Sequence, residues 1–83
     1  MEISVDISLY PLKDEYVDPI IKFIAAVEKN SSLKVVKNSL STQGFGEYKT
    51  VMSILDDEIF NVFDELPDSV IVLKMVGNNR LGA

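Results

Sequence analysis

Hydrophobic and polar residues alternate along the first segment of the chain, with apolar side chains at every second position from Ile3 to Leu9. A period of two is typical of a strand with one buried face, so we predict a strand over this range. Pro11 ends it, because proline has no backbone N–H to donate to a sheet.

Two later segments carry apolar residues three and four positions apart, which is the pattern of an amphipathic helix. The first follows Asp18 and Pro19, which are typical of an N-cap and of the first helical position, and it predicts a helix from Pro19 to Lys29. The second pattern begins at about Glu47 and is stopped by Pro67, so a second helix is predicted between them.

Three further segments are short and rich in β-branched residues, and they predict strands at Leu33–Lys37, Leu40–Phe45 and Val70–Val76. The pair Asn38-Ser39 suits a tight turn, so the first two of these strands are predicted to form a hairpin. Gly44 and Gly46 indicate a bulge or a close backbone approach, and a simple exit from the sheet into the helix is an equally good interpretation for Gly46.

The predicted order is strand, helix, strand, strand, helix, strand. Short connections and right-handed crossovers convert this order into an α+β, ferredoxin-like βαββαβ sandwich, which we expect to form a single domain over residues 1–83. Its four-stranded antiparallel sheet should have the order 4-1-3-2, with both helices on one face.

The other face would carry alternate residues of the last strand, where apolar side chains predominate. Because 47% of the residues are hydrophobic and only 25% charged, we expect a second subunit to cover that face and the chain to be a homo-oligomer, either a dimer or a tetramer.

Composition excludes several classes of function. Without cysteine or histidine the chain has neither a thiolate nucleophile nor the usual zinc ligand and general base. A formal charge of −5 argues against binding to nucleic acid or to anionic membranes. No signal peptide and no apolar run of about 20 residues is visible, so we expect a cytoplasmic protein with no metal and no cofactor.

Two polar strings, Ser8-Leu9-Tyr10-Pro11 and Asn38-Ser39-Leu40-Ser41-Thr42, lie where predicted strands end or turn. In the predicted sheet the first and third strands are antiparallel neighbours, so the two strings should meet at one edge. The candidate ligand-binding residues are therefore Asp6, Ser8, Tyr10, Asn38, Ser41 and Thr42. Hydroxyls, an amide, an aromatic ring and a carboxylate together suit a neutral or cationic planar heterocycle.

The alternative is that the hydroxyls satisfy nearby backbone groups and that Asn38 is only a turn residue. Lys74 could neutralise Asp6 from the adjacent strand.

These strings resemble motifs of the YkoF-type thiamine/hydroxymethylpyrimidine-binding family. The resemblance rests on Ser8-Leu9-Tyr10-Pro11-Leu12 and on Asn38-x-Leu40-Ser41-Thr42, followed by Gly46-x-Tyr48-x-x-Val51-Met52. It implies a ferredoxin-like fold, self-association of single repeats, and binding of thiamine or its pyrimidine half without chemistry. It also implies that Ser8, Tyr10, Ser41 and Thr42 belong to the ligand pocket or border it.

Three functions follow as hypotheses. The first is a non-catalytic binding protein for thiamine or hydroxymethylpyrimidine, acting in storage, delivery or sensing. The second is a regulatory or interaction module that acts through self-assembly without such a ligand. The third, an enzyme, would have to rely on Asp6, Lys74 or Tyr10, and we therefore expect binding rather than catalysis.

Overall fold

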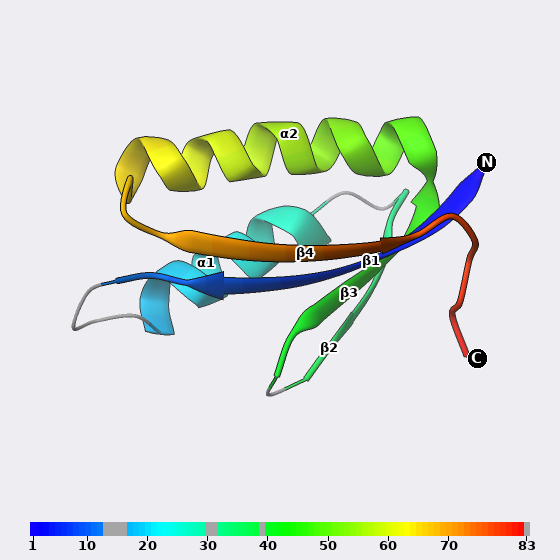
Figure 1. Ribbon diagram of the computed structural model, residues 1–83, viewed down its shortest axis with the longest axis horizontal. Coiled ribbons are helices and arrows are strands. Elements are labelled where there is room, and N and C mark those ends of the chain that lie inside the picture. The colour runs from blue at the N-terminus through cyan, green and yellow to red at the C-terminus, as the bar shows by residue number, and fades with distance from the viewer. Residues whose placement is uncertain (13–16, 30–31, 39, 83) are drawn as a thin grey trace.

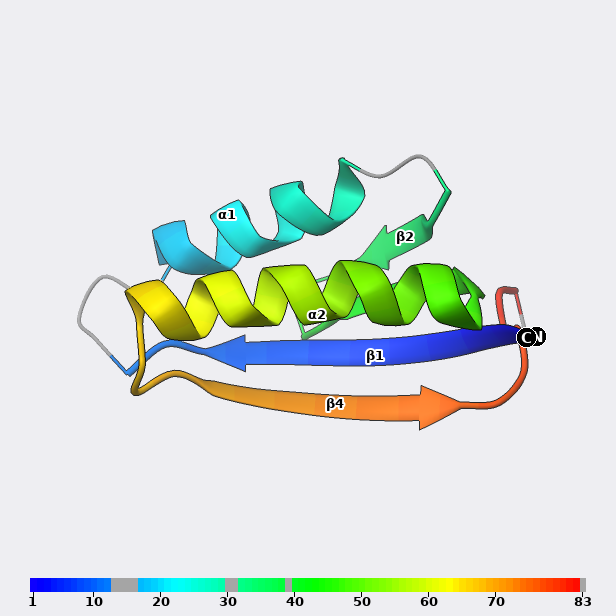
Figure 2. The ribbon, with the colours of Figure 1, turned by 90° about the horizontal axis from the view of Figure 1, so that it is seen from above.

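The computed structural model describes residues 1–12, 17–29, 32–38 and 40–82, and its six elements follow the predicted order. They are β1 (Glu2–Tyr10), α1 (Val17–Glu28), β2 (Lys34–Lys37), β3 (Thr42–Glu47), α2 (Tyr48–Glu65) and β4 (Val70–Val76). The sheet has the order β2-β3-β1-β4, and all neighbouring strands are antiparallel. This confirms the ferredoxin-like α+β fold with the order 4-1-3-2, and both helices pack on one face of the sheet (Figures 1 and 2).

The hydrophobic core lies between this face and the helices, and the central strand β1 is its floor. The odd-numbered residues of β1 from Ile3 to Leu9 are all buried, as their alternation predicts. They pack in one cluster with buried side chains of both helices and of the segment before β2, namely Phe23, Val27, Leu33, Val51, Ile54 and Leu55. Removal of this apolar surface from water is the main stabilising term for so small a fold.

The start of α1 differs from the prediction. The helix begins at Val17, so Asp18 lies in its first turn and is not the N-cap. Pro19 is accommodated because backbone N–H groups in the first turn have no partner within the helix. The carboxylate of Asp18 still lies near the positive end of the helix dipole, where negative charge is favoured. The dipeptide therefore marked a helix start correctly but placed it two residues too late.

The hairpin between β2 and β3 also differs, because β3 begins at Thr42 and not at Leu40. The side chain of Asn38 explains this: its Oδ1 accepts the backbone N–H groups of Leu40 and Ser41 at 2.8 and 3.1 Å. These two residues are held in the turn and are withdrawn from the strand. Ser39, the other residue of the predicted turn, lies outside the described residues.

Gly44 and Gly46 lie within β3, and the register across them is uninterrupted, with Val5 opposite Gly44 and Ile3 opposite Gly46. There is therefore no bulge, the close approach is confirmed, and Gly46 also lies directly before the end of β3 at Glu47 and the start of α2 at Tyr48. A Cβ at Gly46 would lie 3.3 Å from Leu33 Cδ1 and 3.4 Å from the carbonyl oxygen of Ser32. The two glycines make room for Leu33 to pack on β3.

The segment after β4 folds back onto the sheet face that is opposite the helices, which we call the outer face. Ser4 Oγ donates to the carbonyl oxygen of Asn78 at 2.7 Å and accepts the backbone N–H of Arg80 at 2.8 Å. Figure 1 shows this tail turning away from α2. Among the described helices none is long and apolar enough to cross a membrane.

Candidate ligand-binding site

A cavity of about 440 Å³ lies at the carboxyl end of β1, next to the β2–β3 turn and the N-terminal half of α1. Its volume is within the ~300–1,000 Å³ that is usual for small-molecule pockets. The residues around it are Ile7, Ser8, Leu9, Tyr10, Pro11, Leu12, Ile20, Phe23, Ile24, Asn38, Leu40, Ser41 and Thr42. We call it the β1-end cavity.

Five of the six predicted site residues line this cavity, namely Ser8, Tyr10, Asn38, Ser41 and Thr42. The antiparallel pairing of β1 with β3 brings them together, because Ile7 lies opposite Thr42 and the end of one strand therefore meets the start of the other. The structure thus joins the two polar strings at one edge of the sheet.

The opposite wall of the cavity is apolar and comes from α1, through Ile20, Phe23 and Ile24. Sequence reasoning assigned these residues only to the core-facing stripe of the helix. Helical spacing shows only that a residue faces the sheet. It cannot distinguish a residue that packs on the sheet from one that borders a cavity beside it, so the pattern did not predict this wall.

Thr42 is the polar residue most enclosed in the cavity wall, with 5% of its surface exposed. Its hydroxyl forms no hydrogen bond with the described residues, and neither do the hydroxyls of Ser8 and Tyr10. The Thr42 hydroxyl is not fully buried, so a ligand atom placed in the cavity can form a hydrogen bond with it. These three hydroxyls have no protein partner among the described residues and are available to a ligand.

Asn38 and Ser41 are partly committed to the protein itself. The Oδ1 of Asn38 holds the turn, so the turn-residue interpretation holds for that oxygen, while its Nδ2 has no partner among the described residues. Ser41 Oγ lies 2.6 Å from Asp6 Oδ1. An ionised carboxylate only accepts hydrogen bonds, so Ser41 donates its proton to Asp6 and keeps its lone pairs for the cavity.

Asp6, the sixth predicted residue, does not line the β1-end cavity. Its side chain is on the outer face, where Lys74 Nζ lies 3.5 Å from Oδ2, the ion pair considered from the sequence. Asp6 therefore influences the β1-end cavity only through Ser41.

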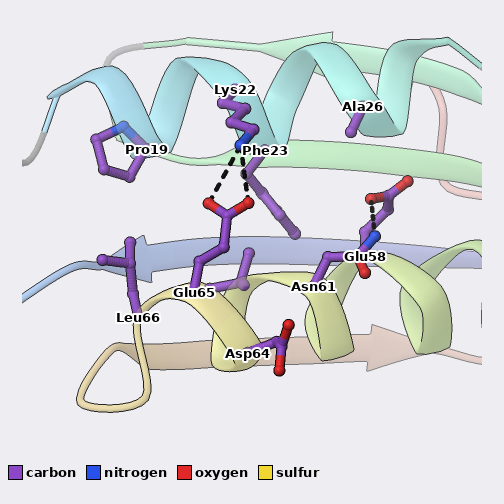
Figure 3. A pocket seen from close by; sticks show the side chains of 10 residues that line it. Pro19, Lys22, Phe23, Ala26, Glu58, Asn61, Asp64, Glu65 and Leu66 are labelled. Carbon is purple, nitrogen blue, oxygen red and sulfur yellow. Dashed lines mark hydrogen bonds and ion pairs between the residues drawn. The ribbon is translucent and has the colours of Figure 1, made fainter.

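A second concavity lies between α1 and α2 and measures about 180 Å³ (Figure 3). Lys22 on α1 crosses it and donates to both carboxylate oxygens of Glu65 on α2, at 2.9 and 3.1 Å. Figure 3 shows the two side chains meeting across the gap. Because this groove is small and is bridged by the protein's own ion pair, we take it as a contact between helices and not as a ligand site.

The sequence matches the YKOF-related family over residues 2–78, which include the whole sheet and both helices. The chain belongs to this family. No curated protein sequence matches it.

Three solved structures with the same fold come from two bacteria and one archaeon. A protein of Streptococcus pneumoniae is similar with a TM-score of 0.87 and 20% identity, over 99% of this chain and 92% of that one. The "putative thiamine biosynthesis/salvage protein" of Thermotoga maritima has a TM-score of 0.82 and 15% identity, over 94% and 85% of the two chains. A hypothetical protein of Methanocaldococcus jannascii has a TM-score of 0.79 and 20% identity, over 95% and 82%. At these identities the likeness shows the fold.

Proposed function

We propose that this protein binds thiamine or its hydroxymethylpyrimidine half in the β1-end cavity and performs no chemistry on it. The observation that carries the proposal is that Ser8, Tyr10, Ser41 and Thr42 surround one cavity, in which the hydroxyl of Thr42 has no partner among the described residues. Membership of the YKOF-related family and the thiamine salvage description of the Thermotoga maritima protein support this choice of ligand.

The chemistry of an aminopyrimidine fits the polar wall. Its exocyclic amino group is a donor, and Ser41 Oγ is an acceptor because its own proton is held by Asp6. The ring nitrogens are acceptors, and the hydroxyls of Thr42 and Ser8 can donate to them. The faces of the flat ring are apolar, which suits packing against the α1 wall of Ile20, Phe23 and Ile24.

A binding role in storage, delivery or sensing agrees with the side chains of the cavity. Its polar lining consists of hydroxyls and one amide, and the sequence has no histidine or cysteine to serve as base or nucleophile. The cavity is therefore suited to hold a ligand by hydrogen bonds and by burying the ligand's surface.

Isothermal titration of the protein, first stripped of ligand by unfolding and refolding, tests the proposal with hydroxymethylpyrimidine and thiamine in separate runs. We expect saturable binding at micromolar concentrations, and the tighter of the two compounds identifies the part of thiamine that is recognised. Flat titrations with both compounds, for a protein that gives the spectrum of a folded chain, would contradict the proposal.

Self-assembly is the second candidate function, and an apolar patch on the outer face favours it. We call Tyr10, Val70 and Val72 the outer apolar patch: Tyr10 and Val70 are opposite each other, Val72 follows on the same face, and all three side chains are exposed. Exposed apolar groups that lie together are typical of a subunit interface. We propose that a second copy of the chain covers this patch, and because Tyr10 also lines the β1-end cavity, the partner would lie next to the ligand.

A further inference from the structure

The outer face carries a second cavity, of about 370 Å³, beside the outer apolar patch. We call it the outer cavity. Asp6 on β1 is directly opposite Gln43 on β3 and Lys74 on β4, and directly opposite residues of neighbouring strands share one face. The next row of the sheet places Phe45 and Val76 on either side of Ser4.

The C-terminal tail adds a guanidinium group to this cavity. The backbone of the tail is held on the sheet by both hydrogen bonds of Ser4, which is only 7% exposed, and by Asn79 Nδ2 donating to Glu2 at 3.0 Å. This anchoring puts Arg80 at the rim of the cavity, and its guanidinium forms no hydrogen bond or ion pair with the described residues.

The remaining polar groups of the cavity are also available to a ligand. The Gln43 amide has no partner within the described residues, and Lys74 makes only the 3.5 Å contact with Asp6 while staying largely exposed. Because Lys74 is largely exposed, its contact with Asp6 contributes little and Lys74 can turn to a ligand at small cost, whereas Asp6 is also held by Ser41. The cavity therefore offers two cations, one carboxylate, one amide and an apolar floor.

We propose that the outer cavity is a binding site for a small zwitterion of the amino-acid type with an apolar side chain. Its carboxylate would lie between Lys74 and Arg80, since guanidinium binds carboxylate in a bidentate manner. Its ammonium group would face Asp6, and its side chain would pack on Phe45 and Val76. The carboxylate of Asp6 disfavours a phosphate or another dianion at the same place. This site is separate from the β1-end cavity, and the two are linked only by the hydrogen bond of Asp6 to Ser41 among the described contacts.

The test is a titration of ¹⁵N-labelled protein followed by two-dimensional NMR, with three matched compounds as ligands. L-phenylalanine carries both charges, 3-phenylpropanoate carries only the carboxylate, and 2-phenylethylamine only the ammonium group. We expect saturable shifts for L-phenylalanine at the amides of Asp6, Gln43, Lys74 and Arg80, with an affinity at least about tenfold above that of either half-compound.

Variants make the assignment specific. Arg80→Gln should weaken L-phenylalanine binding about tenfold or more, whereas Lys29→Gln, which removes an exposed charge after α1, should leave it unchanged. Thr42→Val should also leave it unchanged, so failure here is distinguishable from failure of the thiamine proposal. The inference is overturned if L-phenylalanine does not saturate in the low millimolar range, if a half-compound binds as well, or if Arg80→Gln has no effect.

Discussion

At the scale of the residue, burial and hydrogen bonding divide the polar groups of the candidate site into two kinds. Asn38 Oδ1 and the Ser41 proton are used by the protein, one for the turn and the other for Asp6. The hydroxyls of Thr42, Ser8 and Tyr10 have no partner among the described residues. Hydroxyls of the second kind have both their proton and their lone pairs available to a ligand, whereas Ser41 can only accept a hydrogen bond, so the second kind should contribute most to affinity.

Thr42→Val tests the residue that carries the proposal. Valine has nearly the same shape, so the fold should persist, but loss of the hydroxyl should weaken binding of the tighter thiamine compound by about 1–3 kcal/mol. Titration calorimetry measures this, and Thr50→Val on α2, away from the cavity, is the matched control. Equal affinities for Thr42→Val and the parent protein would remove Thr42 from the site.

The hydrogen bond between Ser41 and Asp6 predicts that the effects of these two side chains on ligand affinity are coupled. If Asp6 acts on the ligand only by holding the Ser41 proton, Asp6→Ala should weaken binding when Ser41 is present and have little effect in a Ser41→Ala background. A double-mutant cycle by calorimetry should give a coupling free energy of about 0.5–3 kcal/mol. The same loss in both backgrounds would show that Asp6 acts by another route.

At the scale of the element, the two glycines of β3 allow core residues such as Leu33 to pack close to the backbone of the strand. A Cβ at Gly44 would lie 3.2 Å from Val5 Cγ2, and a Cβ at Gly46 would lie 3.3 Å from Leu33 Cδ1, so a side chain at either position would be tightly packed. The unbroken pairing of β3 with both β1 and β2 shows that the sheet tolerates the glycines. The glycines thus bring β3 close to the core and fix where its first residue, Thr42, meets the end of β1.

Gly46→Ala should therefore destabilise the protein. The new Cβ would lie 3.3 Å from Leu33 Cδ1, with the Ser32 oxygen and Val51 Cγ2 at 3.4 Å, so the buried Leu33 would have to shift, and overpacking of this kind costs about 1–3 kcal/mol. Urea unfolding monitored by circular dichroism measures the free energy of unfolding. Gly77→Ala is the control, since nothing lies within 4 Å of its Cβ position, and it should stay within about 1 kcal/mol of the parent. An unchanged midpoint for Gly46→Ala would contradict the close-approach explanation.

At the scale of the whole molecule, the outer face of the sheet has two distinct halves. One half is the outer apolar patch and the other is the outer cavity with its charges of both signs. The helices cover the opposite face completely enough to bury the odd-numbered residues of β1. The outer face is therefore the surface on which assembly and a second ligand are both to be sought.

Self-association through the outer apolar patch predicts that Val72→Lys yields a monomer. A charge at this place would lose its hydration in the interface without gaining a partner, which is strongly unfavourable. Sedimentation velocity of the parent and the variant measures the change. Val36→Lys, at the far edge of the same face on β2, should leave the assembly intact. A monomeric parent, or an assembly that survives Val72→Lys, would contradict this interface.

The sequence by itself determined the six elements, their order and hence the topology, because alternation and helical spacing record which side of each element faces the core. It also determined which polar residues meet at the end of β1, since antiparallel pairing of β1 with β3 leaves them no other place. Boundaries that depend on single hydrogen bonds were less accurate, as the late placement of the α1 start and the early placement of the β3 start show.

Only the tertiary structure decided how those residues divide between two cavities. Asp6 and Ser8 share one face by alternation, yet Asp6 lines the outer cavity, where it pairs with Lys74, and Ser8 lines the β1-end cavity. Likewise nothing local to Arg80 indicates that it returns to Ser4, more than 70 residues earlier in the chain. Such contacts depend on the relative positions of distant segments, and hydrophobic periodicity, which is a local property, does not predict those positions.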